Sequence, residues 1–415
     1  MINRITLLVA LVLPAAALAQ RQAPWGTGES RGEDLKISLV TFGDGDTIPE
    51  WFGHTGLLVQ DTRLGQELIY NFGYFDFGPD MLPKFLMGRL EFWVGDELPA
   101  RSFSFYQKRL NRSVRLQELN LSPSRRLEMA RKLAIAVRPE NRTYLYHHYD
   151  DNCATRIRDL IDEATGGQFE EQNSGPATMP LRDHTRRHFE RSFYVNQVLI
   201  YWMNDEIDRE IRVWDEMFLP SVMEARVDAA TYVDESGQTV PLVKSRKTLF
   251  EAKRPAVPEE ASTTWPFALL WGLLFGGGAL LLVRWHQKSG KKLPRTLLAL
   301  EHLLIGLLAG FPALVLCFFW FTEHTVTHFN ETNLLANPLT ALAFPLGIGL
   351  FWGSRRAIRW LSFSWTALAI TSALLVVLKL LPAFDQHVID PVAFFLPLNV
   401  GMAQALWRLH RGAAA

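Results

Sequence analysis

Long apolar stretches in the C-terminal part of this chain constrain its fold more than any other feature. Up to about residue 250 the charged residues are spread along a sequence of globular type, whereas beyond it they vanish for long stretches. A helix that crosses the hydrocarbon core of a bilayer needs about 20 predominantly apolar residues. The pattern predicts five spans: Trp265 to Val283, Leu297 to Phe321, Pro338 to Trp352, Leu361 to Leu381, and Pro391 to Trp407. The third and the fifth are short, so they require interface anchors or burial among neighbouring helices.

Basic residues between these spans predict their orientation. Lys and Arg cluster after the first, third and fifth spans, whereas the loops Thr322 to Asn337 and Pro382 to Asp390 contain neither. Because basic loops stay cytoplasmic, residues 20 to 264 are expected outside the membrane and the C-terminus inside. The whole chain has 43 basic and 43 acidic residues, so its net charge gives no positive electrostatic field of the kind that attracts nucleic acid.

The N-terminal residues predict the same orientation. Residues 1 to 19 carry Arg4, an apolar run and Ala17-Leu18-Ala19, the three regions of a cleavable secretory signal. Five segments are therefore expected: a signal peptide over 1–19, an exported domain over 20–250, a linker over 251–264, a transmembrane helical domain over 265–407 and a cytoplasmic tail over 408–415.

Cys153 is the only cysteine of the exported part, because Cys317 lies inside an apolar segment. It follows Asn152 and opens an amphipathic helix that ends at Gly166-Gly167, a pair suited to a C-cap. At a helix start the dipole and free N–H groups favour a thiolate. An unpaired thiol in an oxidising compartment also suggests a reactive role. The plainer alternative is a small buried apolar residue.

A histidine on a predicted hairpin supplies a base for this thiol. The runs Phe52 to Val59 and Leu68 to Gly73 are strand-like and flank a turn, which brings His54 near Asn71 or its neighbours. A cysteine nucleophile needs a base within hydrogen-bond reach and a third polar group that fixes the imidazole tautomer. Cys153, His54 and Asn71 are the predicted catalytic residues.

Alternatives exist for two of these residues. Asp76 competes with Asn71 for the third position, because the register of the hairpin is not fixed by the sequence, and Asn71 is otherwise a strand-end amide. His147 and His148 compete with His54 as the base. We expect both to be structural, since residues so close to Cys153 in the sequence need a bent backbone to face its sulfur.

Four motifs resemble a known family. Phe-Gly-His-Thr-Gly at 52–56, Tyr-Asn-Phe-Gly-Tyr-Phe-Asp-Phe at 70–77, Arg-Pro-Glu-Asn-Arg-Thr-Tyr at 138–144 and Tyr-Asp-Asp-Asn-Cys-Ala-Thr-Arg at 149–156 resemble the periplasmic domain of Lnb-type bacterial lipoprotein N-acyltransferases. A histidine on one strand, a polar residue on the next and a later Asn-Cys at a helix start also resemble the lecithin-retinol acyltransferases, which have a circularly permuted papain-like fold. The resemblance spans about residues 30 to 245 and extends to the membrane part.

The resemblance implies a fold, a location and a reaction. The fold is α+β, with a circularly permuted papain-like (NlpC-type) cysteine domain followed by an α-helical bundle of about five transmembrane helices. The location is the bacterial inner membrane, with the catalytic domain in the periplasm. The protein is then a cysteine-dependent N-acyltransferase that needs no cofactor or metal. It moves a fatty acyl group from a membrane glycerolipid, expected to be a phospholipid, through a Cys153 thioester to the N-terminal amine of diacylglyceryl-modified lipoproteins. The oligomeric state is left open.

Two other functions compete with this one. A membrane-anchored cysteine hydrolase, either a peptidoglycan amidase or peptidase or a lipid esterase, is the first, because permuted papain-like domains also cleave amides. Several spans are excessive for a wall amidase, whose substrate is a rigid or soluble polymer. A non-catalytic scaffold that binds lipoproteins is the second, but the chain retains a nucleophile and a base.

Further residues are expected to contact substrate. The motifs place Asn152 and Tyr70 beside the catalytic residues. The loops Thr322 to Asn337 and Pro382 to Asp390 are called the outer loops. They are predicted to form a polar surface beneath the exported domain that contacts headgroups or substrate through His324, His328, Asn333 and His387. A zinc site is the alternative for these histidines, but their spacing matches no recognised ligand pattern. The region Phe193 to Val213 is predicted to be helical, and it forms either core or an apolar wall for an acyl chain.

Overall fold

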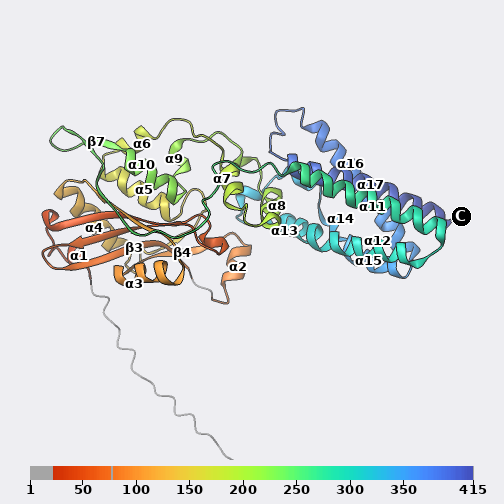
Figure 1. Cartoon of the computed structure of the whole chain (residues 1–415), viewed down its shortest axis with the longest axis horizontal. Coiled ribbons are helices and arrows are strands. Elements are labelled where there is room, and N and C mark those ends of the chain that lie inside the picture. Colours follow the sequence, from red (N-terminus) through yellow and green to blue (C-terminus); the bar gives the residue numbers. More distant parts are fainter. Residues whose placement is uncertain (1–21, 76–77, 415) are drawn as a thin grey trace, which may run out of the picture.

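The computed structural model describes residues 22–75 and 78–414. A mixed α/β domain with an antiparallel sheet occupies one end of the molecule, and a helical region occupies the other (Figure 1). The predicted signal peptide over 1–19 lies outside the described residues, as does Asp76.

Seven strands form the main sheet in the order β6-β4-β3-β2-β1-β5-β9, and every neighbouring pair is antiparallel. Their bounds are β1 Leu35–Phe42, β2 His54–Asp61, β3 Gln66–Tyr74, β4 Glu91–Glu97, β5 Val114–Leu119, β6 Thr143–Leu145 and β9 Val243–Phe250. The predicted hairpin is confirmed, with Gly56 of β2 opposite Asn71 of β3. A separate small hairpin pairs β7 Thr231–Val233 with β8 Thr239–Pro241.

Helices cover both faces of the sheet (Figure 1). The larger core lies under α4 Pro123–Ala136, α5 Cys153–Ala164 and α10 Pro220–Ala229. On the opposite face, α3 Pro99–Ser104 and the π-helical turn η3 Phe105–Arg109 pack on a smaller cluster that includes Phe42 and Ile69. Because side chains alternate along a strand, His54 and Asn71 belong to the η3 face, whereas Tyr70 belongs to the α5 face.

Short elements connect these layers. They are α1 Pro24–Thr27, η1 Gly32–Asp34, η2 Ile48–Glu50, α2 Met81–Leu86, α6 Gln168–Gln172, α7 Leu181–His188, α8 Phe193–Trp202, η4 Asp205–Ile207 and α9 Val213–Glu216. The predicted helical region from Phe193 to Val213 is therefore broken after Trp202, where Met203 is extended. The chain leaves the helix there because Asn204 bonds to an outer loop of the membrane region, donating its backbone N–H to the carbonyl of Val326 at 2.7 Å.

The helical region contains four helices that are long and apolar enough to cross a membrane: Trp265–Ser289, Lys292–Phe319, Arg355–Leu378 and Ile389–Gly412. Its elements are α11 Trp265–Ser289, α12 Lys292–Ile305, the π-helical turn η5 Gly306–Gly310, α13 Phe311–Phe319, η6 Thr325–Thr327, η7 Glu331–Leu334, α14 Pro338–Ala341, α15 Ala343–Phe351, α16 Arg355–Leu378 and α17 Ile389–Ala414. A bent pair, Thr325–Leu334 with Pro338–Phe351, meets at 68° and forms either a broken span or a re-entrant loop.

Helices occupy all five predicted positions, with bounds that differ from the predicted ones by up to several residues. The fifth is longer than predicted, since α17 continues through Pro397 for 26 residues. The third is as short as predicted, since it consists of α14 and the nine-residue α15. It is stabilised by burial against α12 rather than by its own length: a Cβ placed on Gly347 would lie 3.1 Å from Cβ of His302.

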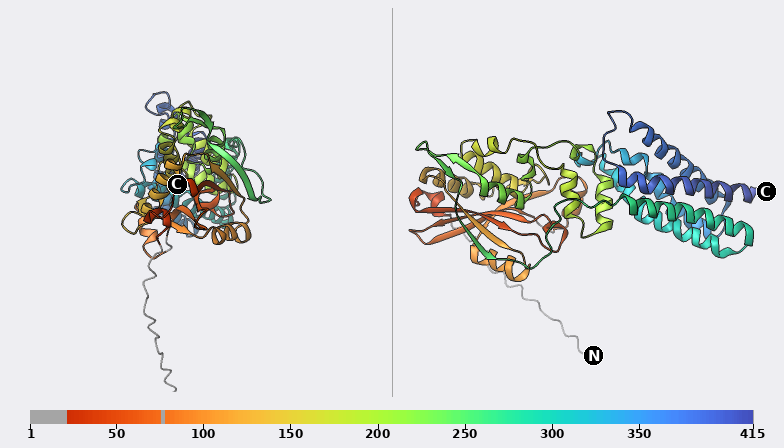
Figure 2. Two further views of the ribbon diagram at one scale, coloured as in Figure 1. Left: turned by 90° about the vertical axis from the view of Figure 1, so that its left-hand side faces the viewer. Right: turned by 45° about the horizontal axis from the view of Figure 1, so that its top comes forward.

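Helices α11 and α17 run parallel along the whole helical region. Thr264 donates a hydrogen bond to Asp390 at one end, and Gln287 donates to the carbonyl of Arg408 at 3.0 Å at the other. Close approach depends on glycine, because a Cβ on Gly276 would lie 2.4 Å from the Pro397 carbonyl oxygen. The C-terminus consequently lies at the end farthest from the sheet (Figure 1 and Figure 2).

Asn330 connects the α/β domain to the helical region. Its Nδ2 donates to the carbonyls of Tyr201 at 3.2 Å and Trp202 at 2.7 Å, at the end of α8. Its Oδ1 accepts from the backbone N–H of Thr332 at 3.0 Å and from Nε2 of Gln386 at 2.9 Å. One buried amide therefore joins α8 to both outer loops.

Asn330→Ala is expected to weaken this junction. The substitution leaves buried carbonyl and amide groups without these partners, and each such group costs about 1–3 kcal/mol. The apparent melting temperature in detergent should fall, and proteolysis between α8 and the helical region should accelerate. Asn141→Ala, which removes an exposed amide that donates to the carbonyl of Ile135, is the matched control. Equal melting of the two variants would contradict the role of Asn330.

Candidate active site

A cavity of about 770 Å³ lies at one end of the sheet, beside the start of α5. Strands β2, β3 and β4, helix α2 and the segment before α5 contribute to its wall. Cys153 and His54 both line it, together with Asn152, His148 and several aromatic rings. The fold thus brings the predicted nucleophile and the predicted base to one cavity, although they are far apart in the sequence.

Asn152 fixes the position of Cys153. It is the N-cap of α5, and its Oδ1 accepts from the backbone N–H groups of Ala154 at 2.8 Å and Thr155 at 3.0 Å. Its Nδ2 donates to the carbonyls of His148 at 2.7 Å and Phe218 at 3.0 Å. An amide has two donors and two acceptor sites, so none remains for a substrate. The side chain predicted to bind substrate instead holds the first turn of α5 in place.

Burial dominates the electrostatics of the sulfur. It raises the pKa of the Cys153 thiol, while the backbone N–H of Thr55, the charge of Arg112 and the N–H groups at the helix start act in the opposite direction. The expected thiolate is therefore not the resting form, because desolvation outweighs the helix start. The resting group is a thiol.

His54 is held by aromatic rings and an amide. Its imidazole stacks on Phe42 at 5.8 Å and on Tyr106 at 6.1 Å between ring centroids. Its Nε2 lies 3.2 Å from Oδ1 of Asn71. Because Nδ2 of Asn71 donates to the hydroxyl of Tyr74 at 3.1 Å, Oδ1 is the atom that faces the imidazole. Nε2 then carries the proton, and Nδ1 is left as the basic nitrogen.

Burial also lowers the pKa of His54 to about 4, and the charge of Arg112 acts in the same direction. The imidazole is therefore neutral at neutral pH and able to accept a proton. Among the described residues no hydrogen bond joins the sulfur of Cys153 to His54. Catalytic hydrogen bonds are often loose before substrate binds, so this geometry is compatible with the predicted pair of nucleophile and base.

Arg112 is a residue that sequence reasoning missed. It is buried, its guanidinium lies 5.0 Å from the Tyr106 ring, and its Nε donates to the carbonyl of Gly43 at 2.6 Å. Its Nη2 has no hydrogen-bond partner among the described residues. No motif marks this arginine, because only the packing of η3 against β1 and β2 brings it near Cys153 and His54.

The remaining predicted residues differ in their position relative to the cavity. Tyr70 faces the core under α5, where its hydroxyl accepts from Nε1 of Trp25 at 2.8 Å, so it does not line the cavity. His148 does line it, against Phe52 and Phe218, and burial lowers its pKa to about 4. Asp76, the alternative third residue, lies outside the described residues.

The outer-loop residues form the junction instead of the cavity wall. His324 bonds to the carbonyl of Phe85 at 2.6 Å, and His328 to the carbonyl of Thr322 at 3.0 Å. Asn333 donates to the carbonyl of Asn330 at 3.2 Å, and the backbone N–H of His387 donates to Asp208 at 2.8 Å. In residues 22–75 and 78–414 no group of three His, Cys, Asp or Glu side chains is placed to hold a metal.

The fold and the cavity define a membrane protein with a mixed α/β domain that presents a cysteine, a histidine and an asparagine at one end of its sheet. Residues 21–189 match the family model described as the Lnb N-terminal periplasmic domain. This match confirms the resemblance seen in the motifs. Comparisons with curated proteins and with solved structures gave no match. The family indicates an acyltransferase that takes part in lipoprotein processing, with a periplasmic domain on a membrane anchor.

Arg112→Gln is expected to raise the pKa of the Cys153 thiol further above its ordinary value, because a nearby cation that favours the thiolate is lost. The pH dependence of alkylation by iodoacetamide measures this pKa in a Cys317→Ser background. Arg115→Gln is the control, since Arg115 pairs with Glu224 at 2.8 Å. A Cys153 pKa left unchanged by Arg112→Gln would show that this charge does not act on the sulfur, and a pKa below that of free cysteine would show that burial does not dominate.

Proposed function

We propose that this protein is a cysteine-dependent lipoprotein N-acyltransferase. It takes a fatty acyl group from a membrane glycerolipid onto Cys153 and transfers it to the N-terminal amine of a diacylglyceryl-modified lipoprotein. The observation that carries the proposal is the hydrogen bond between His54 and Asn71 at the cavity that Cys153 also lines. The family match over 21–189 includes all three residues.

The order of these residues supports a circularly permuted papain-like domain. In papain-like proteases the cysteine lies near the start of the mature chain, and the histidine and asparagine follow it. Here His54 and Asn71 precede Cys153, whereas the cysteine still opens a helix and the histidine still lies on a strand. A permutation of the chain termini accounts for the reversed order with the same set of groups.

In the first half-reaction the thiol proton passes to Nδ1 of His54 as Sγ of Cys153 attacks an ester carbonyl of the lipid. The N–H groups of Thr55 and Cys153, which face the sulfur, are placed to donate to the developing oxyanion. The ester C–O bond breaks, and His54 returns the proton to the leaving glycerol oxygen. The products are a Cys153 thioester and a lysolipid.

In the second half-reaction the lipoprotein amine attacks the thioester. His54 accepts a proton from the amine, the C–S bond breaks, and the proton restores the Cys153 thiol. The product is an N-acylated lipoprotein. The apolar cavity wall limits water, which favours the amine over hydrolysis.

The contacts of α2 support an entry route from the outer leaflet. Phe85 lines the cavity, and Leu82 and Met87 on the same helical segment are also exposed. The segment is attached to the first outer loop through an ion pair between Arg89 and Glu323 at 2.6 Å. An apolar helix at the level of the outer loops gives a lipid ester a short path into the cavity.

The positive-inside pattern and the parallel α11 and α17 support the proposed organisation. Residues 20–250 form the periplasmic catalytic domain and 251–264 the linker; 265–407 form the transmembrane domain and 408–415 a cytoplasmic tail, with the inner membrane as the location. The C-terminal ends of α11 and α17, to which Arg284 and Arg408 belong, lie at the end of the helical region farthest from the sheet (Figure 1), as this orientation requires.

The acyl-enzyme is tested directly in vesicles that contain a phospholipid with an isotope-labelled acyl chain. The full chain should carry one labelled, hydroxylamine-sensitive acyl group on the Cys153 peptide, and a diacylated lipopeptide should become N-acylated. Cys153→Ala should abolish both, and Cys317→Ala should preserve both. N-acylation by Cys153→Ala would rule out this nucleophile. Labelled free fatty acid without N-acylated lipopeptide would instead identify a lipid esterase.

The role of His54 predicts a pH dependence. With a pKa of about 4, His54 is a competent base above that pH and is lost as a base below it. The rate of thioester formation should therefore rise through about pH 4 and stay constant around neutrality. His54→Ala should lower it by about 10²- to 10⁴-fold. His148→Ala, which removes a buried imidazole from the same cavity, is the control. A larger loss in His148→Ala than in His54→Ala would assign the base to His148.

A further inference from the structure

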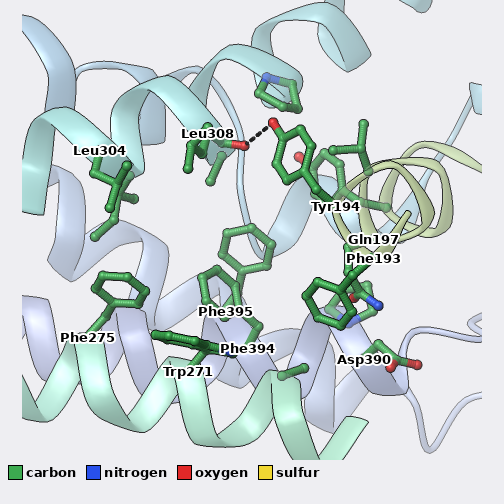
Figure 3. A pocket seen from close by; sticks show the side chains of 17 residues that line it. Phe193, Tyr194, Gln197, Trp271, Phe275, Leu304, Leu308, Asp390, Phe394 and Phe395 are labelled. Atoms are coloured by element: carbon green, nitrogen blue, oxygen red, sulfur yellow. Dashed lines mark hydrogen bonds between the residues drawn. The ribbon is translucent and has the colours of Figure 1, made fainter. Parts of the chain in front are cut away.

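A second cavity, of about 410 Å³, lies where α8 meets the membrane helices (Figure 3). Helices α11, α12, α13 and α17 and the η5 turn supply the rest of its wall. Aromatic and aliphatic side chains dominate the wall, and they include Phe193, Tyr194, Trp271, Phe275, Leu308 and Phe395. It shares no lining residue with the cavity at Cys153.

A proline frees a carbonyl for the contact between α8 and the membrane helices. Pro312 has no N–H, so the carbonyl of Leu308 lacks the donor that a regular helix provides. The hydroxyl of Tyr194 donates to that carbonyl at 3.0 Å instead (Figure 3). Nε1 of Trp202 donates to the carbonyl of Pro312 at 2.9 Å. These two bonds attach α8 to the side of one membrane helix, while the space toward α11 and α17 stays unfilled.

One end of the cavity is polar. Gln197 and Asp390 line it there, and Nε2 of Gln197 lies 3.3 Å from Oγ1 of Thr264. Arg186 approaches Asp390 at 3.8 Å, and its buried Nε has no hydrogen-bond partner among the described residues. Thr264 precedes α11, and Asp390 lies in the first turn of α17. The polar end of the cavity therefore faces the α/β domain. The cavity is thus amphipathic along its length.

We propose that this cavity binds one acyl chain of a membrane glycerolipid, with the ester end of the lipid beside Gln197. Its volume lies within the range of small-molecule sites. Phe193 and Trp271, each 49% exposed, flank its opening among helices that cross the bilayer. An acyl chain fills an apolar space that water does not stabilise, and an ester carbonyl accepts from the amide of Gln197.

The second cavity is close in the sequence to the cavity at Cys153. Phe189 lines the cavity at Cys153, and Phe193 lines the second cavity. Four peptide units span at most about 14 Å, so the two walls are joined by one short loop. Binding of an acyl chain here does not depend on the proposed reaction, and its test uses no enzymatic readout.

Photolabelling of the full chain tests the site. The protein is reconstituted in phosphatidylethanolamine and phosphatidylglycerol vesicles that contain a phosphatidylcholine with a diazirine in its acyl chain. After irradiation, mass spectrometry should find labelled peptides from α8, from the start of α11 and from η5. Ala268→Phe and Ala309→Phe fill the cavity, and each should lower this labelling at least about tenfold.

Ala373→Phe is the matched control, because Ala373 is exposed on α16 and lines neither cavity. It should retain wild-type labelling of the cavity peptides. Gel filtration of each variant in detergent verifies that it is folded. Labelling of these peptides that is equal in all variants, or that never exceeds the labelling of the α16 surface, would overturn the proposal. A copurified peptide segment crosslinked there in place of lipid would overturn it as well.

Discussion

The four hydrogen bonds of the Asn152 amide are the interaction on which the candidate site depends. They close the first turn of α5 and tie it to the segment before that helix and to Phe218. The sulfur of Cys153 follows directly, so its position relative to β2 is set by a buried, fully satisfied side chain. Such a network is rigid because each unmade bond would leave a polar group unpaired in the interior.

Desolvation then determines the protonation states at the site. Burial raises the pKa of Cys153 and lowers that of His54, so both groups rest in their neutral forms. Arg112 opposes burial at the sulfur and reinforces it at the imidazole. A neutral pair avoids the cost of burying an isolated ion.

Helix α8 couples this domain to the membrane region in two ways. Its C-terminal carbonyls bond to Asn330 of an outer loop, and its Tyr194 bonds to a carbonyl that Pro312 leaves free. The first contact fixes the position of the α/β domain relative to the membrane helices. The second contact leaves a cavity beside α8. Its wall is mostly apolar and one end is polar, as a lipid has apolar chains and a polar head.

Local patterns in the sequence determined several elements. They predicted the β2–β3 hairpin, the helix that begins at Cys153 and four of the long apolar helices, because periodicity, caps and apolar length act over neighbouring residues. They also brought His54 near Asn71, since hairpin pairing follows from a short turn. The sequence did not reveal Arg112 beside the site or Tyr70 facing the core, because long-range packing and strand register decide which side chains meet. Nor did it predict that α8 ends at Trp202, or that α17 runs from Ile389 to Ala414. Those boundaries depend on hydrogen bonds and burial between segments that are distant in the chain, and only the tertiary structure brings such segments together.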